Sequence, residues 1–259
     1  MSTDMNDSVN NSLPRGVAFF DAVARAEKSC FELTSSEIPV LGISTPACFA
    51  AMGDVLSSLY GEAACLHGCK GGDHFYQRLA ARIASLSLSS IRLAMAGYYD
   101  ESLALTRSIG EIANLLFLFS AKPSEIEVWR NSDEASRKKN FKLVDVRTKI
   151  EKLGLKPPID KDHYSLLCET GVHLVPSVSP QSFNEHSRPS LGASFRIEGL
   201  MCTFNELAVA LAEAAACLSI FPESEDRRLS LQYEAQLLLS ASGQLDLGSI
   251  RASTKPSSP

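Results

Sequence analysis

Apolar residues recur three or four positions apart along most of this chain, which is the spacing of residues on one face of a helix. Thr45 followed by Pro46 is typical of a helix start, and Pro123 is expected to end the helix before it. No stretch alternates between apolar and polar residues as a half-buried strand does, so the chain is expected to be all-α. The pattern predicts long helices over residues 15–33, 45–66, 73–97, 101–121, 195–221 and 223–241.

The middle of the chain is more mixed and predicts shorter helices. Short helices are expected over 124–153, after which Lys156-Pro157-Pro158 interrupts the chain. Asp160 or Asp162 is expected to cap a short helix that stops at Gly171. Together the patterns predict a helical bundle of about six or seven helices, antiparallel where the connections are short.

The ends of the chain and one internal loop lack the helical pattern. Residues 1–13 and 244–259 are expected to be disordered, which leaves a single all-α domain over 14–243 with its core in 44–221. A Ser- and Pro-rich stretch at 176–194 predicts a long loop before the penultimate helix. A loop of this length is unusual in a compact domain, so it is expected to be either functional or disordered.

Composition narrows the class of protein. The chain has 259 residues, of which 45% are hydrophobic, and its formal net charge is −5. This apolar content excludes a disordered chain. The acidic balance excludes a globally basic nucleic-acid binder, although it leaves room for a local basic patch.

The cysteines and the longest apolar segments indicate a compartment. The seven cysteines are scattered, and most lie inside apolar helical patterns, as reduced cysteines do. The first residues lack the basic and apolar regions of a secretory signal. The apolar segment at 112–121 is short for a membrane span and the one at 197–221 carries glutamates, so both are interpreted as core helices. We therefore expect a cytoplasmic protein without a membrane span.

The local signatures of common enzyme families are missing. The chain has no phosphate-binding loop, dinucleotide fingerprint, nucleophile elbow or zinc-protease motif, and no cofactor is predicted. Cys65, His67, Cys69 and His74 offer thiolate and imidazole groups close together in the sequence. Their spacing matches no common zinc motif, so core cysteines and turn histidines are the favoured interpretation and no metal is predicted.

A polar stripe interrupts the apolar helix predicted over 101–121. Arg107 and Glu111 share one face, with Gly110 and Asn114 alongside. Gly110 would let a backbone or a ligand approach closely. Two explanations remain open: a buried or half-buried ion pair that fixes helix register, or a ligand-binding or catalytic site.

His173 is a second candidate, because it lies just past the predicted end of the short helix. Its cation would be favoured by the helix dipole at that end. The imidazole is expected either to act as a general acid or base, or to cap and pack.

A basic segment is the third candidate. Between residues 137 and 156 there are eight basic and two acidic residues, which gives a local charge of +6. The segment either attracts phosphate groups or forms a solvated helix face. Its candidate ligand-binding residues are Lys138, Lys139, Lys142 and Arg147.

The order of these features resembles a known family. A helix with the sequence ALTRSIGEIANLLFLF, a Trp-bearing basic segment with VRTKIEKLGL, and then HYSLLCETGVHLVPS are similar to uncharacterised bacterial all-helical proteins. Those proteins are related to the HEPN (higher eukaryotes and prokaryotes nucleotide-binding) superfamily, and the resemblance covers about residues 73–221. The recurring marks are an Arg and a Glu one turn apart, and a Tyr followed by a His at a helix end. They fall on Arg107, Glu111, Tyr164 and His173.

The resemblance implies several further properties. HEPN-like proteins are helical bundles, often dimeric, and many act in toxin or phage-defence systems. Their active members are metal-independent ribonucleases that use an Arg followed a few residues later by a His, in a cleft shared by two subunits. This chain departs from that motif, because no Arg lies among the five residues before His173.

Three functions are consistent with the sequence, and whether the protein is an enzyme stays open. The first is a HEPN-like bundle that binds a nucleotide, RNA or a protein partner, with Asn114 and Tyr164 among its binding residues. The second is a metal-independent ribonuclease in which His173 transfers the proton and Arg107, paired with Glu111, stabilises the developing charge. The third is a structural protein whose apolar helices form an oligomer interface. A homo-oligomer is expected in each case.

Overall fold

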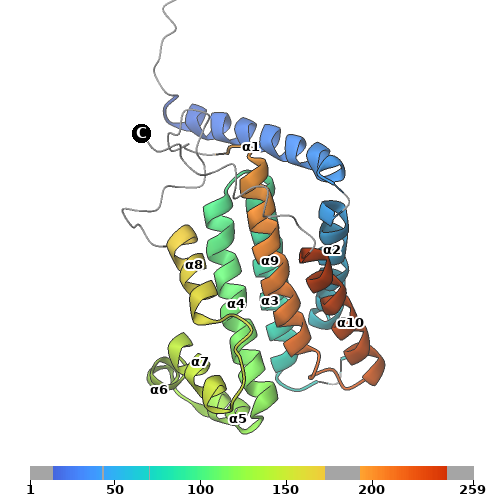
Figure 1. Cartoon of the computed structure of the whole chain (residues 1–259), viewed down its shortest axis with the longest axis vertical. Coiled ribbons are helices and arrows are strands. Elements are labelled where there is room, and N and C mark those ends of the chain that lie inside the picture. Colours follow the sequence, from blue (N-terminus) through green and yellow to red (C-terminus); the bar gives the residue numbers. More distant parts are fainter. Residues whose placement is uncertain (1–13, 43, 70, 173–192, 244–259) are drawn as a thin grey trace, which may run out of the picture.

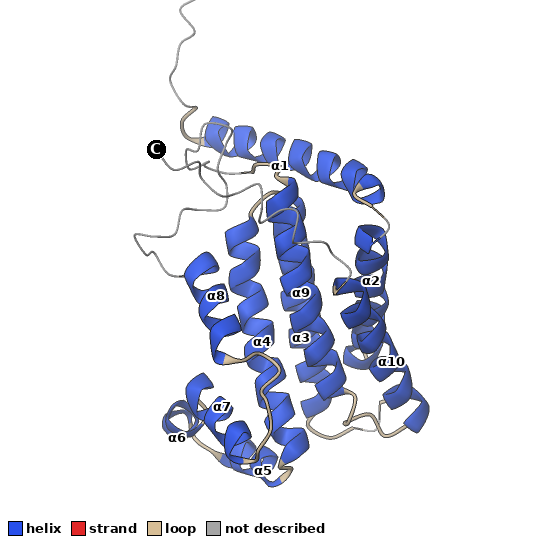
Figure 2. Cartoon of the chain, in the orientation of Figure 1, coloured by secondary structure: helices blue, strands red, loops and turns tan. Residues whose placement is uncertain are grey.

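The all-α prediction is confirmed, because the described residues form α-helices and one 3-10 helix and contain no strand (Figure 2). The predicted disordered ends, 1–13 and 244–259, and most of the predicted loop at 176–194 lie outside these residues. The structure of the chain is a computed structural model (Figure 1), which describes residues 14–42, 44–69, 71–172 and 193–243.

The described part contains ten α-helices, more than the six or seven predicted. The difference arises in the segment after Pro123, where the mixed pattern divides into three separate short helices. Asp160 caps the next helix as predicted, since its carboxylate accepts a hydrogen bond from His163 N at 3.0 Å. The elements are α1 (Val17–Glu37), η1 (Ile38–Val40), α2 (Ser44–Ala63), α3 (Phe75–Met95), α4 (Tyr99–Ala121), α5 (Ser124–Asn131), α6 (Glu134–Asn140), α7 (Leu143–Lys152), α8 (Lys161–Gly171), α9 (Ile197–Leu218) and α10 (Glu225–Ser242).

Helix α9 lies at the centre of the bundle and packs against α2, α3, α4 and α10 (Figure 1). It is apolar on nearly all sides, and a helix of that kind is stable only when it is surrounded. Gly199 lies so close to the ring of Tyr99 that a Cβ would come within 2.4 Å of it, so a residue without a side chain is needed at this crossing of α9 and α4. Leu231, Ala235 and Leu238 of α10 belong to the same core, which therefore extends beyond residues 44–221.

Two of the described helices, α4 and α9, are long and apolar enough to cross a membrane. In the structure they pack against each other, and 56% and 67% of their apolar windows are buried. A third candidate arises only if α1 with η1 and α2, which meet at a bend of 112°, are taken as one span. The burial of α4 and α9 agrees with core helices, while the cytoplasmic location stays a prediction.

The segment after α7 and helix α8 pack closely against α4 beside the central helices. Gly110 makes the first contact possible, because a Cβ there would lie 2.9 Å from Cγ1 of Ile159. Gly171 has the same role for α8, since a Cβ there would lie 2.8 Å from backbone atoms of Asp100 and Ala104. The close approach predicted for Gly110 is therefore made by another part of the chain.

Candidate functional site

Arg107 and Glu111 form an ion pair along one edge of α4. The Arg107 Nη2 lies 2.8 Å from Glu111 Oε1, and Nε donates to the same oxygen at 3.0 Å. The two side chains remain 23% and 35% exposed, so solvent or a ligand can reach them. Burial opposes the positive charge of Arg107, but the Glu111 carboxylate outweighs this effect and raises the Arg107 pKa.

Tyr164 of α8 completes this group. Its hydroxyl donates a hydrogen bond to Glu111 Oε1 at 3.2 Å, and the guanidinium carbon of Arg107 lies 5.3 Å from the ring centroid. Burial raises the pKa of Tyr164, so the hydroxyl stays protonated at neutral pH and acts as a donor. The structure thus brings Tyr164 to Arg107 and Glu111, although Tyr164 lies more than fifty residues after them in the sequence.

Arg147 of α7 approaches the same aromatic ring. Its guanidinium carbon lies 4.9 Å from the Tyr164 ring centroid, which is within cation–π range. Only 9% of Arg147 is exposed, and its Nη1 has no hydrogen-bond partner among the residues that the structure describes. A buried guanidinium with an unsatisfied donor is costly, so this position needs an explanation.

The sequence of α7 explains how Arg147 becomes buried. Val146 and Ile150 lie one turn apart and form a small apolar cluster with Leu118 of α4. This cluster fixes the face that α7 turns toward α4, and Arg147 is adjacent to it. We call Arg107, Glu111, Arg147 and Tyr164 the Tyr164 site, in which two guanidinium groups stand against one carboxylate.

The rest of the basic segment divides into paired and unpaired residues. Lys149 bonds to the buried Glu125 at 2.7 Å, and Lys138 pairs with Glu134 one turn earlier on α6. Lys139 and Lys142 are exposed, and no ion pair is found for them within the described part of the chain. Some of the charge of the segment is therefore used within the fold and some is presented to solvent, and attraction of phosphate groups stays a prediction.

Asn114 does not belong to a ligand site. It is fully buried, its side-chain nitrogen donates to the Ile159 carbonyl at 2.8 Å, and its side-chain oxygen accepts from the Ile159 N–H at 2.9 Å. Both polar atoms of the amide are thus used to hold the segment before α8 against α4. The prediction that Asn114 binds a ligand was wrong, because the polar stripe contains one residue that serves the fold.

His173 lies outside the described residues, so its position relative to Arg107 is not described. The histidine that the structure places nearby is His163, whose Nε2 bonds to Glu206 of α9. The hydrogen bond with the Glu206 carboxylate raises the pKa of His163, against an opposing effect of burial. One signal for this pair is present in the sequence, because Glu206 is one of three glutamates in the otherwise largely apolar segment that forms α9.

The His163–Glu206 pair predicts a pH-dependent contribution to stability. A raised histidine pKa stabilises the folded state below the ordinary pKa of histidine, and this contribution is lost as the pH rises through the folded-state value. We expect Glu206→Gln to lower the free energy of unfolding by about 1 kcal/mol near about pH 6 and by less near about pH 9. Urea unfolding at the two pH values measures both effects.

Glu213, also on α9, provides the control for this experiment. Burial raises the pKa of Glu213, so its ionised form destabilises the folded state. We expect Glu213→Gln to change stability in the opposite direction, with a gain that is larger near about pH 9 than near about pH 6. An equal loss for Glu206→Gln at both pH values would show that the His163 charge contributes nothing.

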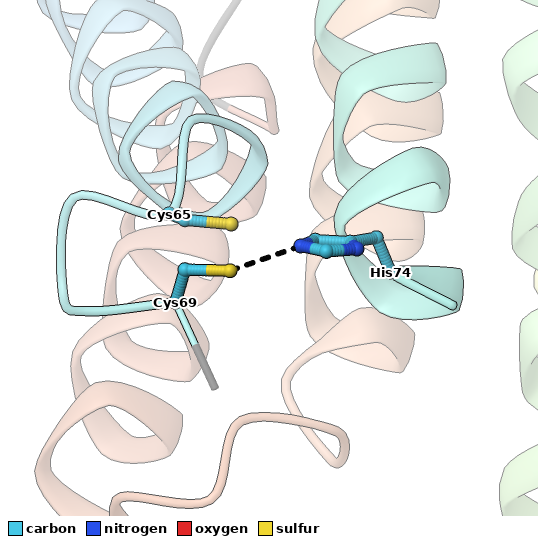
Figure 3. A group of neighbouring side chains, drawn as sticks. All are labelled: Cys65, Cys69 and His74. Atoms are coloured by element: carbon cyan, nitrogen blue, oxygen red, sulfur yellow. Dashed lines mark hydrogen bonds between the residues drawn. The ribbon is translucent and has the colours of Figure 1, made fainter. Parts of the chain in front are cut away.

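A third group of polar residues lies after α2. Cys65 is half-buried and Cys69 is exposed, so the interpretation of these two as core cysteines was wrong. Their sulfur atoms and a ring nitrogen of His74 all lie within 4.8 Å of one another (Figure 3). Cys30, Cys48, Cys168 and Cys217 are buried, as expected for cysteines inside apolar helical patterns, while the reduced state stays a prediction.

The Tyr164 site is the stronger candidate for the predicted activity, because it brings together four of the predicted residues and one of them, Arg147, is an unsatisfied cation. Its chemistry is suited to a ligand with negative charge and a flat polar or aromatic part. Comparisons with known proteins neither add to this assignment nor change it. No family model matches the chain, and no curated protein or solved structure does.

Proposed function

We propose that this protein binds a phosphate group of RNA or of a nucleotide at the Tyr164 site. The observation that carries the proposal is the buried Arg147 guanidinium, which among the residues that the structure describes has no carboxylate partner and an unsatisfied Nη1. A phosphate oxygen would be a suitable acceptor for this donor once the half-buried side chains of Arg107 and Tyr164 move aside, because guanidinium donors match phosphate geometry.

The neighbours of Arg147 support the same ligand class. Glu111 holds Arg107 through Nε and Nη2, and the remaining Nη1 is directed at Cys168 Sγ at 3.9 Å. Tyr164 contacts both guanidinium groups with its ring between α4 and α7, and so holds two cations close together, as a phosphate requires. Exposed Lys139 and Lys142 would attract the phosphate backbone from solution.

The resemblance to HEPN-related proteins points to the same class of ligand and to a place in a toxin or phage-defence system. Binding without catalysis is the simpler form of the proposal, since the chain lacks the Arg that precedes the His in active members. A metal-independent ribonuclease that uses His173 and Arg107 is the alternative. Cleavage of RNA in the presence of EDTA that is lost in His173→Ala would favour it.

Binding of a labelled single-stranded RNA to the full chain, followed by fluorescence anisotropy over a range of salt concentrations, tests the proposal. We expect the affinity to fall steeply with salt, because counterions are released from the phosphates that the protein neutralises. Replacing both Lys139 and Lys142 by glutamine is expected to weaken binding and to lower the salt slope by about 2.

Competition separates the two sources of phosphate. Displacement of the RNA by a mononucleotide at low concentration would assign the site to a nucleotide, whereas displacement only by a second RNA would assign it to the polymer. Lys138→Gln is the matched control, because Lys138 already pairs with Glu134. The absence of salt-dependent binding to either probe would overturn the proposal.

An exposed apolar stripe on α10 favours a second candidate function, self-association. Leu229, Tyr233 and Leu237 lie at successive turns of one helix face and are 57%, 66% and 45% exposed. A stripe of this kind is typical of a surface that another helix covers. Light scattering of the full chain shows whether the protein forms the expected homo-oligomer.

A further inference from the structure

The connection between α2 and α3 forms a turn that carries Cys65, Cys69 and His74. Cys65 follows the end of α2, Cys69 belongs to the connection, and His74 immediately precedes α3. Figure 3 shows both sulfur atoms and the edge of the imidazole ring directed toward one another across this turn. The Cys69 Sγ and His74 Nε2 are 3.1 Å apart.

The separations fit a tetrahedral metal centre. With Zn–S bonds of about 2.3 Å and Zn–N bonds of about 2.0 Å, ligand atoms around zinc lie roughly 3.5–3.8 Å apart. The three ligand atoms are all within 4.8 Å of one another, so only small side-chain rotations are needed to reach these distances. Two thiolates and an imidazole form a donor set that zinc prefers and that magnesium and calcium do not.

The second ring nitrogen of His74 is held in the way that metal-binding histidines require. Nδ1 lies 3.1 Å from the Gly72 carbonyl oxygen, and a carbonyl can only accept a hydrogen bond. Nδ1 must therefore carry a proton in this contact, which in neutral imidazole leaves the lone pair on Nε2. That nitrogen is the one directed at Cys69, and a carbonyl behind the ring is the usual orienting partner of a metal ligand.

The backbone adds an independent observation. Cys65 and His74 have φ of 54° and 51°, and they are the non-glycine residues with positive φ in the described part of the chain. Cys65 occupies the left-handed position of a helix C-terminal motif, in which Leu66 N bonds to the Gly61 carbonyl at 3.0 Å. Glycine is the usual residue at such a position, so a cysteine there retains strain in exchange for its side chain.

Two carboxylates beside this cluster already have cationic partners. The Asp73 carboxylate is bound by Arg130 of α5, and the buried Glu62 accepts a hydrogen bond from Arg227 at 3.0 Å. A fourth coordination position is therefore left to water or a small molecule. The cluster lines a pocket of about 900 Å³ between the start of α3 and the start of α10, which gives such a molecule access.

We propose that Cys65, Cys69 and His74 bind one Zn²⁺ ion with an open coordination position that faces this pocket. An open position is the feature that distinguishes reactive zinc sites from structural ones, which have four protein ligands. The proposal is independent of the Tyr164 site, since the two share no residue.

Zinc titration of the reduced full chain, after removal of bound metal by a chelator, tests this proposal. We expect one Zn²⁺ per chain by competition with a chromophoric chelator, and a rise in melting temperature on zinc addition. Cobalt in place of zinc is expected to give the intense thiolate charge-transfer absorption of a tetrahedral site. Cys65→Ser, Cys69→Ser and His74→Ala should each weaken binding by more than about 100-fold.

His67→Ala is the matched control, because His67 lines the same pocket but lies outside the cluster. The His67→Ala variant is expected to retain zinc affinity. Its melting temperature without zinc shows whether a substitution in this turn destabilises the fold independently of zinc binding. Failure of the reduced wild-type protein to bind zinc at micromolar concentrations would overturn the proposal, as would wild-type zinc affinity in the three ligand variants. Loss of binding in His67→Ala would contradict the open position.

Discussion

Replacing Arg147 by methionine is expected to raise the free energy of unfolding of the ligand-free protein by about 1 kcal/mol. Arg147 is 9% exposed, and the cation–π contact of its guanidinium with Tyr164 offsets only part of the cost of burying an unsatisfied charged group. Methionine keeps most of the side-chain volume and the contact with the ring while removing the charge. Urea unfolding of wild type and variant measures the difference.

Arg107→Met is the matched comparison for this experiment. Its guanidinium already bonds to Glu111, and removing it leaves that carboxylate with Tyr164 as its remaining described partner. We therefore expect Arg107→Met to lower stability by about 0.5–1 kcal/mol, the opposite sign from Arg147→Met. A loss of 1 kcal/mol or more in Arg147→Met would mean that Arg147 is an architectural residue.

Asn114→Ala is expected to lower the free energy of unfolding by about 2–4 kcal/mol. The substitution removes both hydrogen bonds that join the Asn114 side chain to the Ile159 backbone, and it leaves a buried N–H and a buried carbonyl without partners. The segment that connects α7 to α8 would then lose its attachment to α4. Chemical denaturation measures the loss of stability directly.

Asn131→Ala provides the control for this second experiment. Asn131 is exposed at the end of α5, so we expect its replacement to change stability by less than about 0.5 kcal/mol. If Asn114→Ala behaves like the control, the paired hydrogen bonds to Ile159 do not hold the connecting segment, and the assignment of Asn114 to the fold is wrong.

The long helices could be predicted from the sequence because their burial is encoded locally. Helix α4 was expected over 101–121 and is found over Tyr99–Ala121, since one face of the apolar pattern continues through the whole segment. The shared face of Arg107 and Glu111 follows from the same periodicity and is confirmed by their ion pair. Features that depend on a single helix could therefore be predicted from the sequence.

Features that depend on contacts between two or more helices could not be predicted from the sequence. The basic segment contained Arg147 as one of eight cations, and only the packing of Val146 and Ile150 against α4 distinguishes it from its exposed neighbours. Tyr164 could be predicted as a site residue only from the resemblance to a family, because the spacing of residues along the chain does not indicate that α8 packs against α4. The sequence does not show that Arg147 Nη1 lacks an acceptor, because the groups around it come from other helices.

The cluster of Cys65, Cys69 and His74 could not be predicted from the sequence for a different reason. The sequence places Cys65 at the end of an apolar helix, where a core position is the ordinary expectation. The chain instead leaves the helix through a left-handed residue at Cys65, a conformation that sequence patterns assign to glycine. The turn then brings His74 back to the two cysteines. The spacing of these residues in the sequence does not indicate this proximity, because it matches no common zinc motif.

Binding of single-stranded RNA to Arg147→Met, at one salt concentration and beside wild type, tests the central claim most directly. We predict at least about a ten-fold loss of affinity, the effect of removing one guanidinium–phosphate contact, in a variant that is no less stable than wild type. Lys138→Met, which removes a cation already paired with Glu134, should change the affinity by less than about two-fold. Wild-type affinity in Arg147→Met would contradict the account, because the buried cation would then have no part in holding a phosphate.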